Sequence, residues 1–225
     1  MHEEENKIWN KNYTGLKMAC WNPWGLCNER FNFCMTMDYD VLGLTELHNV
    51  QNKKGWKGRR WITCDDSEID ALTGKTNDPA SGVGLLLSRH VADRLLAHGS
   101  IGTRIVWGRF EGPVCPLLVV LAYVPHKYKK TSPCATDVLA QLHNLLSDSK
   151  KVNPNDCVIL MGDFNCELQR NVQGCTDRWF MNKRPDDGHS SQVIDLLRSH
   201  DLFTIDSLFK PKKKISWARG EAESM

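Results

Sequence analysis

The chain has 225 residues, of which 41% are apolar and 25% are charged. A chain of this length and composition can bury a sizeable core, which excludes a disordered or fibrous protein and favours one globular domain. Lysine and arginine total 29 against 27 acidic residues, so the formal net charge is only +2. Overall charge therefore does not indicate a nucleic-acid binder, and any attraction to phosphate has to come from local patches.

The cysteines and the apolar runs indicate in which cellular compartment the protein is expected and whether it enters a membrane. Nine cysteines are present, an odd number with no C-x-x-C pair, and the first ten residues are polar rather than a signal peptide. We therefore predict reduced thiols in a cytosolic or nuclear protein. The longest apolar run, residues 117–124, is far too short to span a bilayer, so we expect no membrane partner.

The beginning of the chain predicts a polar arm, a strand and a helix. The arm comprises residues 1–16, and the strand comprises residues 17–21, directly before Asn22. Because a proline follows Asn22, this asparagine has the context of an ordinary turn former. Asn28 is a suitable N-cap for a helix over residues 29–37.

A second strand is predicted over residues 41–44, and Glu46 follows it. A single glutamate at a strand end is commonly a solvated residue, yet a carboxylate at this place also suits a hard cation such as Mg²⁺. Residues 51–78 then combine lysines and arginines with Trp56 and Trp61. Such a segment can follow a phosphate backbone and stack on bases, although a solvated loop is the commoner meaning.

The middle of the chain predicts more strands. Residues 81–88 predict a strand whose glycines suggest close packing, and residues 104–111 and 117–126 predict a hairpin. Tyr123 lies near the end of the second hairpin strand. By residue type alone it is a core tyrosine with a satisfied hydroxyl, and the nearby His126 is better explained as a surface histidine.

A packed helix is expected after Ser132 and Pro133, which have the pattern of an N-cap and a first helical residue. The apolar run 158–161 next predicts a buried strand that ends in Gly162, where the chain can bend or a ligand can approach.

Asp163 and Asn165, two residues apart, can point the same way at the end of this strand. There the carboxylate can accept a proton from water while the amide orients that water or donates to a phosphate oxygen. An Asx turn after the strand is the alternative.

The last part of the chain is polar and turn-rich until a second predicted helix. This helix begins near Ser191, and its inward stripe is Val193, Ile194, Leu196 and Leu197. The basic run 210–214 fits a nuclear-localisation patch, a phosphate contact or a solvated loop.

Several motifs together resemble the endonuclease/exonuclease/phosphatase superfamily, which includes DNase I, apurinic/apyrimidinic endonucleases, inositol polyphosphate 5-phosphatases and non-LTR retrotransposon endonucleases. The matching motifs are W-N-P-W-G-L at 21–26, L-x-E ending at Glu46, Y-x-P beginning at Tyr123 and G-D-F-N at 162–165. The segments that follow, with Leu208-Phe209 and Ser216-Trp217, are most similar to the retrotransposon type.

This resemblance implies an α/β fold, a four-layer α/β sandwich (DNase I-like) that lacks its last strands. The domain would cover residues 17–217, between the arm and a polar tail at 218–225. The implied metal ligands of Mg²⁺ (or Mn²⁺) are Glu46 and Asn22. In the implied reaction Asp163 activates a water, Asn165 positions it and Tyr123 donates to the developing charge. The implied substrate contacts are Ser216, Trp217 and Arg178.

The implied activity is a metal-dependent phosphodiesterase that nicks DNA as a monomer. One departure leaves the activity open: the family's site is completed by a Ser-Asp-His segment, and this tripeptide occurs nowhere in the sequence. Two alternatives therefore remain. One is a truncated, inactive remnant that at most binds nucleic acid, and the other is a phosphatase or sphingomyelinase of the same superfamily.

Overall fold

The computed structural model describes residues 15–48, 59–64, 82–126, 133–168, 172, 175 and 189–205. The chain divides into two compact units, Met1–Asn165 and Cys166–Met225, and each is described here by itself. All nine cysteines are free thiols. None of the described helices is long and apolar enough to cross a membrane.

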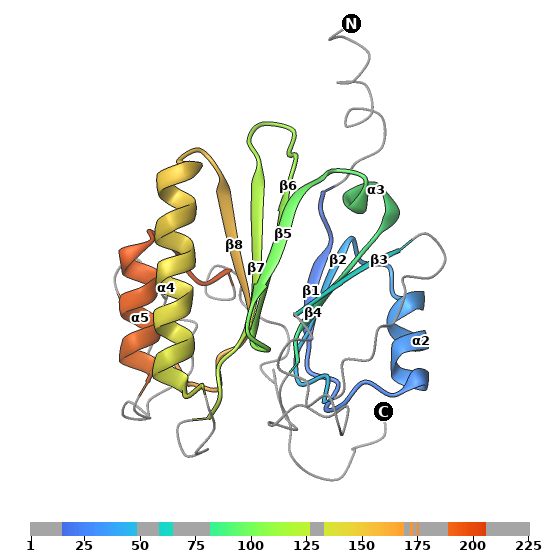
Figure 1. Cartoon of the computed structure of the whole chain (residues 1–225), viewed down its shortest axis with the longest axis horizontal. Coiled ribbons are helices and arrows are strands. Elements are labelled where there is room, and N and C mark those ends of the chain that lie inside the picture. Colours follow the sequence, from blue (N-terminus) through green and yellow to red (C-terminus); the bar gives the residue numbers. More distant parts are fainter. Residues whose placement is uncertain are drawn as a thin grey trace, which may run out of the picture. The chain divides into compact units, whose positions relative to one another are not determined.

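Two four-stranded sheets form the framework of the first unit (Figure 1). The strands of the first sheet, in spatial order, are β1 (Met18–Trp21), β2 (Val41–Leu44), β4 (Gly84–Leu87) and β3 (Arg60–Thr63). Those of the second sheet are β5 (Leu95–Ile101), β6 (Ile105–Phe110), β7 (Leu117–Tyr123) and β8 (Cys157–Asp163). Only β1 with β2 and β7 with β8 pair in parallel, and each of these pairs is connected through a helix.

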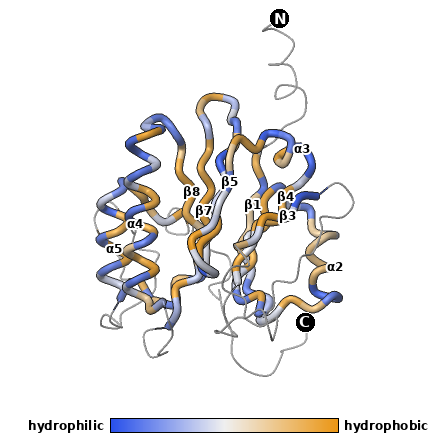
Figure 2. Tube along the Cα trace, viewed as in Figure 1, coloured by the Kyte–Doolittle hydropathy of each residue, from blue (hydrophilic) through white to orange (hydrophobic). Residues whose placement is uncertain are grey.

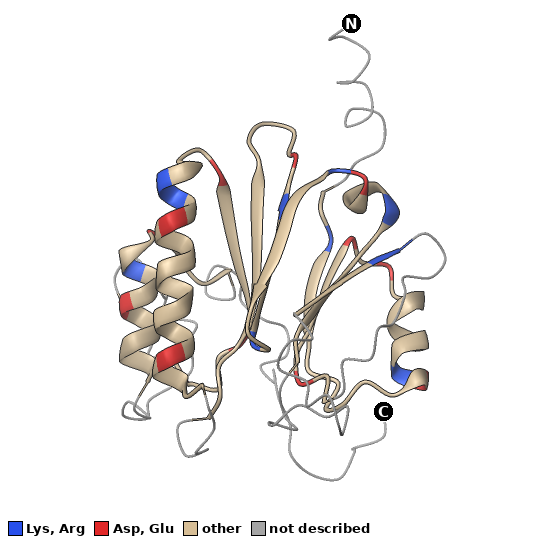
Figure 3. Ribbon diagram, in the orientation of Figure 1, with Lys and Arg blue, Asp and Glu red and all other residues tan. Residues whose placement is uncertain are grey.

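The two sheets pack face to face, and helices cover their outer sides. Helix α2 (Asn28–Thr36) lies outside the first sheet and α4 (Ala135–Val152) outside the second (Figure 1). The strands carry most of the hydrophobic residues, whereas α4 is hydrophilic on one side (Figure 2). Charged residues lie mostly on helix surfaces and at strand ends (Figure 3). The fold is therefore the layered α/β sandwich that the sequence predicts.

A glycine allows the close approach between the sheets. A Cβ atom at Gly43 of β2 would lie 2.7 Å from Cδ1 of Leu121 and 3.4 Å from the sulfur of Met161, both of which belong to the second sheet. The core around this contact draws on both sheets, with Val41, Leu44 and Leu85 on one side and Val119 and Leu121 on the other. Burial of this apolar surface is the main stabilising contribution to the fold.

The predicted helix caps are wrong in position. Helix α2 includes Asn28, and its N-cap is Cys27, whose side chain makes no capping hydrogen bond. Helix α4 begins later than predicted, with Cys134 as its N-cap, while Ser132 lies outside the described residues. There the backbone N–H of Cys134 donates to the carboxylate of Asp137 at 2.9 Å. An acid three residues after the cap thus fixes this helix start.

Strand β5 and the short helix α3 (Arg89–Ala92) were not predicted from the sequence. Strand β5 is an edge strand without a buried residue, in which Leu96, Ala97 and His98 are exposed in succession, so it lacks the apolar alternation by which strands are recognised. Helix α5 (Ser190–Ser199) of the second unit confirms the predicted helix near Ser191, because all four residues of its predicted inward stripe are buried.

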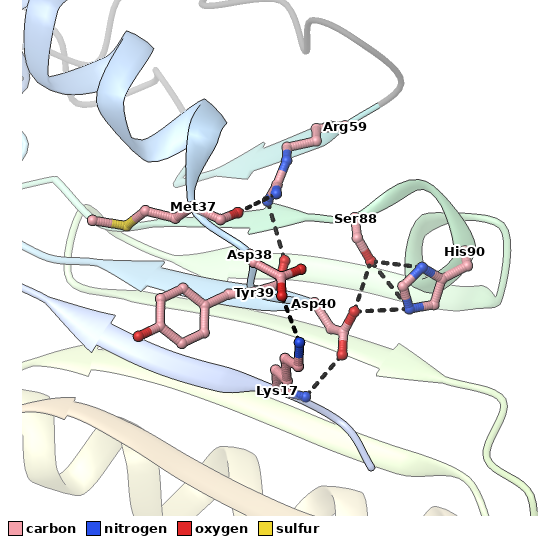
Figure 4. Close-up of polar contacts among 8 residues, drawn as sticks. All are labelled: Lys17, Met37, Asp38, Tyr39, Asp40, Arg59, Ser88 and His90. Carbon is pink, nitrogen blue, oxygen red and sulfur yellow. Dashed lines mark hydrogen bonds and ion pairs between the residues drawn. The ribbon is translucent and has the colours of Figure 1, made fainter. Parts of the chain in front are cut away.

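A polar network joins the amino-terminal ends of β1 and β2 to α3 (Figure 4). The carboxylate of Asp40 accepts hydrogen bonds from the backbone N–H of Lys17 at 2.8 Å and from the Ser88 hydroxyl at 3.5 Å. It also pairs with Nε2 of His90 at 2.9 Å. Asp40 therefore ties three elements together at the end of the sheet opposite to the site described next.

Candidate active site

Polar residues gather where the two parallel strand pairs end. Asn22 follows β1 and Glu46 follows β2, while Tyr123 and Asp163 are the last residues of β7 and β8. Because both pairs are parallel, each pair delivers its carboxyl ends to the same edge of its sheet. Two contacts then bridge the sheets, Asn22 to Asp163 at 3.2 Å and Tyr123 to Glu46 at 2.5 Å.

The carboxylate of Asp163 is held by two amide groups. Its Oδ2 atom accepts a hydrogen bond from Nδ2 of Asn22, and its Oδ1 atom accepts one from the backbone N–H of Asn165 at 3.1 Å. The side chain of Asn165 donates to the carbonyl oxygen of Val124 at 2.9 Å. These bonds leave the carboxylate a fixed orientation.

Asp163 and Asn165 come together by a turn rather than by strand alternation. Strand β8 ends at Asp163, and Asn165 has a left-handed φ of +46°. The hydrogen bond from the Asn165 N–H to the Asp163 side chain is that of an Asx turn. The turn and the polar pair, which the sequence offers as alternatives, are thus present together.

Gly162 is required immediately before this turn. Its φ is +147°, and a Cβ atom at this position would lie 1.9 Å from the carbonyl oxygen of Ala122 on β7. No side chain fits such a space. The close approach keeps β7 and β8 in register up to their last residues, so that Tyr123 and Asp163 are direct neighbours.

Tyr123 is a buried hydrogen-bond donor. Its side chain is only 1% exposed, and its hydroxyl donates to Oε1 of Glu46. Burial raises the pKa of the phenol far above its usual value, and the hydrogen bond to Glu46 adds to the rise. The phenol therefore stays protonated near neutral pH. The guanidinium carbon of Arg104, itself a fully buried residue, lies 5.1 Å from the centre of the Tyr123 ring.

The loop that carries Glu46 also carries His48, a residue that the sequence analysis did not single out. Both have left-handed backbone conformations, with φ of +50° at Glu46 and +61° at His48. The loop is held by hydrogen bonds from the N–H of Gly25 to the Glu46 carbonyl at 2.8 Å and from the N–H of Leu26 to the Leu47 carbonyl at 3.0 Å. The only feature of the sequence that points to His48 is its position two residues after Glu46.

Other predicted residues lie away from this cluster or outside the described part of the chain. Ser216, Trp217, Arg178 and Trp56 belong to the latter group. Trp61 does not present its ring as a stacking surface, because it packs edge-to-face on Phe31 and against Gly84. Arg59 donates to the carbonyl oxygens of Met37 and Tyr39, so it has a structural role here.

The cluster offers a divalent cation few protein ligands. Within the described ranges, no group of three or more His, Cys, Asp and Glu side chains is placed to hold a metal ion. Oε1 of Glu46 is engaged by Tyr123, and Oε2 makes no hydrogen bond within that part of the chain, so one carboxylate oxygen is open. A single available carboxylate oxygen suits a cation such as Mg²⁺, which keeps most of its water ligands and binds a protein through one or two carboxylates.

The chain has two packed sheets with helices outside them, and its polar cluster lies at the carboxyl ends of the parallel strands. This is the arrangement of a layered α/β protein with a site at its strand ends. Residues 21–182 match the model of the Endonuclease/Exonuclease/phosphatase family, and the chain belongs to this family. No curated protein matches the sequence.

Two solved structures with TM-scores above 0.5 share this fold at low sequence identity, and a third is similar over a smaller part of the chain. The endonuclease domain of TRAS1, a telomere-specific non-LTR retrotransposon, is 14% identical, covers 82% of this chain and 72% of its own, and has a TM-score of 0.51. The catalytic domain of Xenopus laevis APE2 is 15% identical, with coverages of 82% and 67% and a TM-score of 0.54. A humanized D. rerio TDP2 is 18% identical, with coverages of 67% and 62% and a TM-score of 0.45. The chain thus spans a little over three fifths of that TDP2.

Proposed function

We propose that the chain carries a phosphodiesterase site that nicks DNA with the help of a divalent cation. The observation that carries this proposal is the convergence of Asn22, Glu46, Tyr123 and Asp163 from four strand ends, joined by the two hydrogen bonds between the sheets. Amide groups hold the carboxylate of Asp163, and the phenol of Tyr123 holds the carboxylate of Glu46. The two acids can therefore have different tasks, proton transfer for Asp163 and cation binding for Glu46.

Asp163 is the proposed base. The amides of Asn22 and Asn165 hold its carboxylate, so that it meets the attacking water in one orientation and takes its proton. Asn165 was expected to position that water, but its side-chain Nδ2 atom already donates a hydrogen bond to the carbonyl oxygen of Val124. We therefore assign it first to holding the Asp163 turn, and its side-chain oxygen remains the group for orienting water.

Glu46 is the proposed ligand of Mg²⁺ or Mn²⁺. Its Oε2 atom makes no hydrogen bond in the described part of the chain, and Tyr123 fixes the carboxylate through Oε1. Such a cation, when bound, polarises a phosphate oxygen and stabilises the leaving group. Asn22 fits a supporting role, because its Oδ1 atom accepts from the N–H of Trp24 at 2.9 Å while its Nδ2 atom faces Asp163.

DNA is favoured over a small phosphoester by an exposed aromatic ring. Trp24 lies two residues from Asn22, is bonded to it through the backbone, and has 72% of its surface exposed. Exposed aromatic rings beside a phosphate site are the usual stacking surfaces for unpaired bases. The similarity to the endonuclease domain of TRAS1 supports testing DNA first.

The test is nicking of supercoiled plasmid in the presence of Mg²⁺ by the wild-type chain and its Asp163→Asn and Glu46→Gln variants. We expect nicking by the wild type and its loss in both variants. Asp148→Asn is the matched control, since this exposed carboxylate on α4 pairs only with Lys151 in the described structure. Nicking that survives in Asp163→Asn would show that the assigned base is wrong.

Two other outcomes would each name a different function. Salt-dependent DNA binding by the folded protein without any nicking would support a nucleic-acid-binding role. Turnover of p-nitrophenyl phosphate without plasmid nicking would instead support a phosphatase.

A further inference from the structure

We propose that His48 is a second protein ligand of the cation at Glu46, binding through Nε2 beside Oε2 of the carboxylate. The inference rests on the proposed function, which places a divalent cation at Glu46. It goes further by adding a nitrogen ligand, and thereby a preference among cations, that neither the motifs nor the proposed chemistry requires.

The first reason is the state of the imidazole nitrogen. Nε2 of His48 is buried and has no hydrogen-bond partner within the part of the chain that the structure describes. A buried polar atom without a partner costs free energy, so such an atom is normally completed by an ordered water or a bound ligand. The atom that Nε2 approaches is Oε2 of Glu46, the oxygen that Tyr123 leaves open.

The second reason is the separation of these two atoms. Nε2 and Oε2 are 3.8 Å apart, which is too long for a hydrogen bond. Two atoms that each bind one ion at about 2.0–2.2 Å lie about 3–4 Å apart when the bond angle at the ion is between about 90° and 130°. The observed separation lies at the upper end of that range, above the about 3 Å expected for a right angle at the ion, and the side chains of His48 and Glu46 are 29% and 14% exposed.

The third reason is the backbone that sets this arrangement. Left-handed conformations at both Glu46 and His48 are unfavourable for residues with side chains, and they persist only where the surrounding structure enforces them. Here the hydrogen bonds from Gly25 and Leu26 enforce them. Strained backbone of this kind concentrates at functional sites.

Gly25 also fixes the imidazole ring itself. A Cβ atom at this glycine would lie 3.3 Å from Nδ1 of His48 and 3.6 Å from its Cγ atom, so the ring packs directly on the glycine backbone. With the Nδ1 edge against Gly25, Nε2 is turned toward the carboxylate. The ligand pair is therefore in place before any cation arrives.

A nitrogen ligand changes which cation the site prefers. A nitrogen ligand favours first-row transition metals, among which Mn²⁺ binds most weakly, whereas Mg²⁺ prefers oxygen ligands and near-ideal octahedral geometry. If His48 is a ligand, the site should bind Mn²⁺ more tightly than Mg²⁺, and the difference should depend on His48. If His48 only holds Glu46 in place, its removal should weaken both cations equally.

The experiment measures cation binding directly, with the full chain and without DNA. Mn²⁺ is titrated by electron paramagnetic resonance, Mg²⁺ is measured by competition, and the bound Mn²⁺ is examined for electron spin echo modulation from a ligand nitrogen. The variants are His48→Gln and Glu46→Gln, with His143→Gln on the exposed side of α4 as the control. Thermal melting shows that each variant is folded.

We expect nitrogen modulation in the wild-type spectrum and its loss in His48→Gln. Affinity for Mn²⁺ should fall by about tenfold or more, since even partners outside the coordination sphere cost about 10–100-fold, and affinity for Mg²⁺ should fall less. Wild-type protein that binds Mn²⁺ without nitrogen modulation, or that binds no cation, would overturn the inference. Because nitrogen modulation is measured on the wild-type protein, this test does not depend on whether a variant folds. Absence of plasmid nicking despite nitrogen-ligated Mn²⁺ would count against the proposed function alone.

Discussion

The hydroxyl of Tyr123 donates to Glu46 from a position that solvent does not reach. In Tyr123→Phe this donor is lost while the ring and its packing remain. We expect kcat for plasmid nicking to fall by about 10–100-fold, the typical cost of losing the group that orients a metal ligand, with a smaller change in KM. Steady-state nicking kinetics, with a thermal melt to show an intact fold, test this. An unchanged kcat would mean that Glu46 needs no fixed partner.

Trp24 is the residue that should separate DNA from smaller substrates. Its exposed ring is free for stacking, whereas its backbone N–H supports Asn22 and survives substitution. In Trp24→Ala we expect DNA affinity to fall by about 1–3 kcal/mol, the usual contribution of one base-stacking ring. Hydrolysis of bis(p-nitrophenyl) phosphate should change little. Equal losses on both substrates would place Trp24 in the reaction rather than in DNA binding.

At the scale of elements, one partly buried ion pair ties β6 to the turn that precedes β8. Nε and Nη2 of Arg109 donate to the two carboxylate oxygens of Asp156 at 2.6 and 3.0 Å, and the Asp156 side chain is 3% exposed. Removing Asp156 would leave the guanidinium of Arg109, which is 23% exposed, without these two hydrogen bonds.

Asp156→Ala should therefore lower the free energy of unfolding by about 1–3 kcal/mol, the usual cost of losing hydrogen bonds between charged groups. The control is Asp148→Ala, which removes an exposed pair with Lys151 and should cost less than about 1 kcal/mol. Urea unfolding of the two variants measures the difference. Similar losses in both would show that the Arg109 pair is effectively solvated.

Helix α2 carries a thiol that makes stability depend on pH. Cys34 is fully buried, and burial raises the pKa of its thiol to about 11. Because the folded-state pKa lies above the unfolded value of about 8.5, this stabilisation is complete below about pH 8.5 and is lost as pH rises toward 11. The loss is at most about 1.4 kcal/mol per pH unit. Urea midpoints between pH 8 and 11 should fall less steeply in Cys34→Ala, and equal slopes would contradict this origin.

Elements with a strong apolar pattern were predictable from the sequence, and those without one were not. Strands β2, β7 and β8 are continuous apolar runs, and α5 has a clean stripe, so each lies where it was expected. Strand β5 is stabilised by pairing with β6 and not by a pattern of its own. The predicted starts of α2 and α4 differ from the observed ones because the N-cap residues are cysteines. Cysteine is not among the residues by which an N-cap is recognised in a sequence.

The five residues proposed for the reaction were also identified from sequence, but their contacts were not. A motif places Asp163 at a strand end, yet nothing in it states that Asn22 rather than a solvent molecule will hold the carboxylate. His48 was missed for the same reason: its interest lies in the left-handed loop and in the space above Gly25, and neither is visible without coordinates.

At the scale of the whole molecule, the small net charge bears on the proposed action on DNA. A formal charge of +2 supplies no strong long-range field, so the proposed DNA binding would rely on a few local phosphate contacts and on stacking. We expect the logarithm of the DNA affinity to fall with the logarithm of salt concentration at a slope well short of the value of about −10 that strongly electrostatic binders show. Fluorescence anisotropy at several salt concentrations measures this slope. A steep slope would reveal an extensive basic surface.

The contacts between the sheets also determine when the site can exist. Asn22 and Asp163 are 141 residues apart in the sequence, and Glu46 and Tyr123 are 77 apart. Such distant pairings form late, because the entropy of closing long loops has to be offset by other native contacts. On the ribosome, the Asn22–Asp163 contact cannot form before residue 163 has left the exit tunnel. The two hydrogen bonds thus report completed folding of the first unit, and a partly synthesised or partly folded chain does not yet have the assembled site.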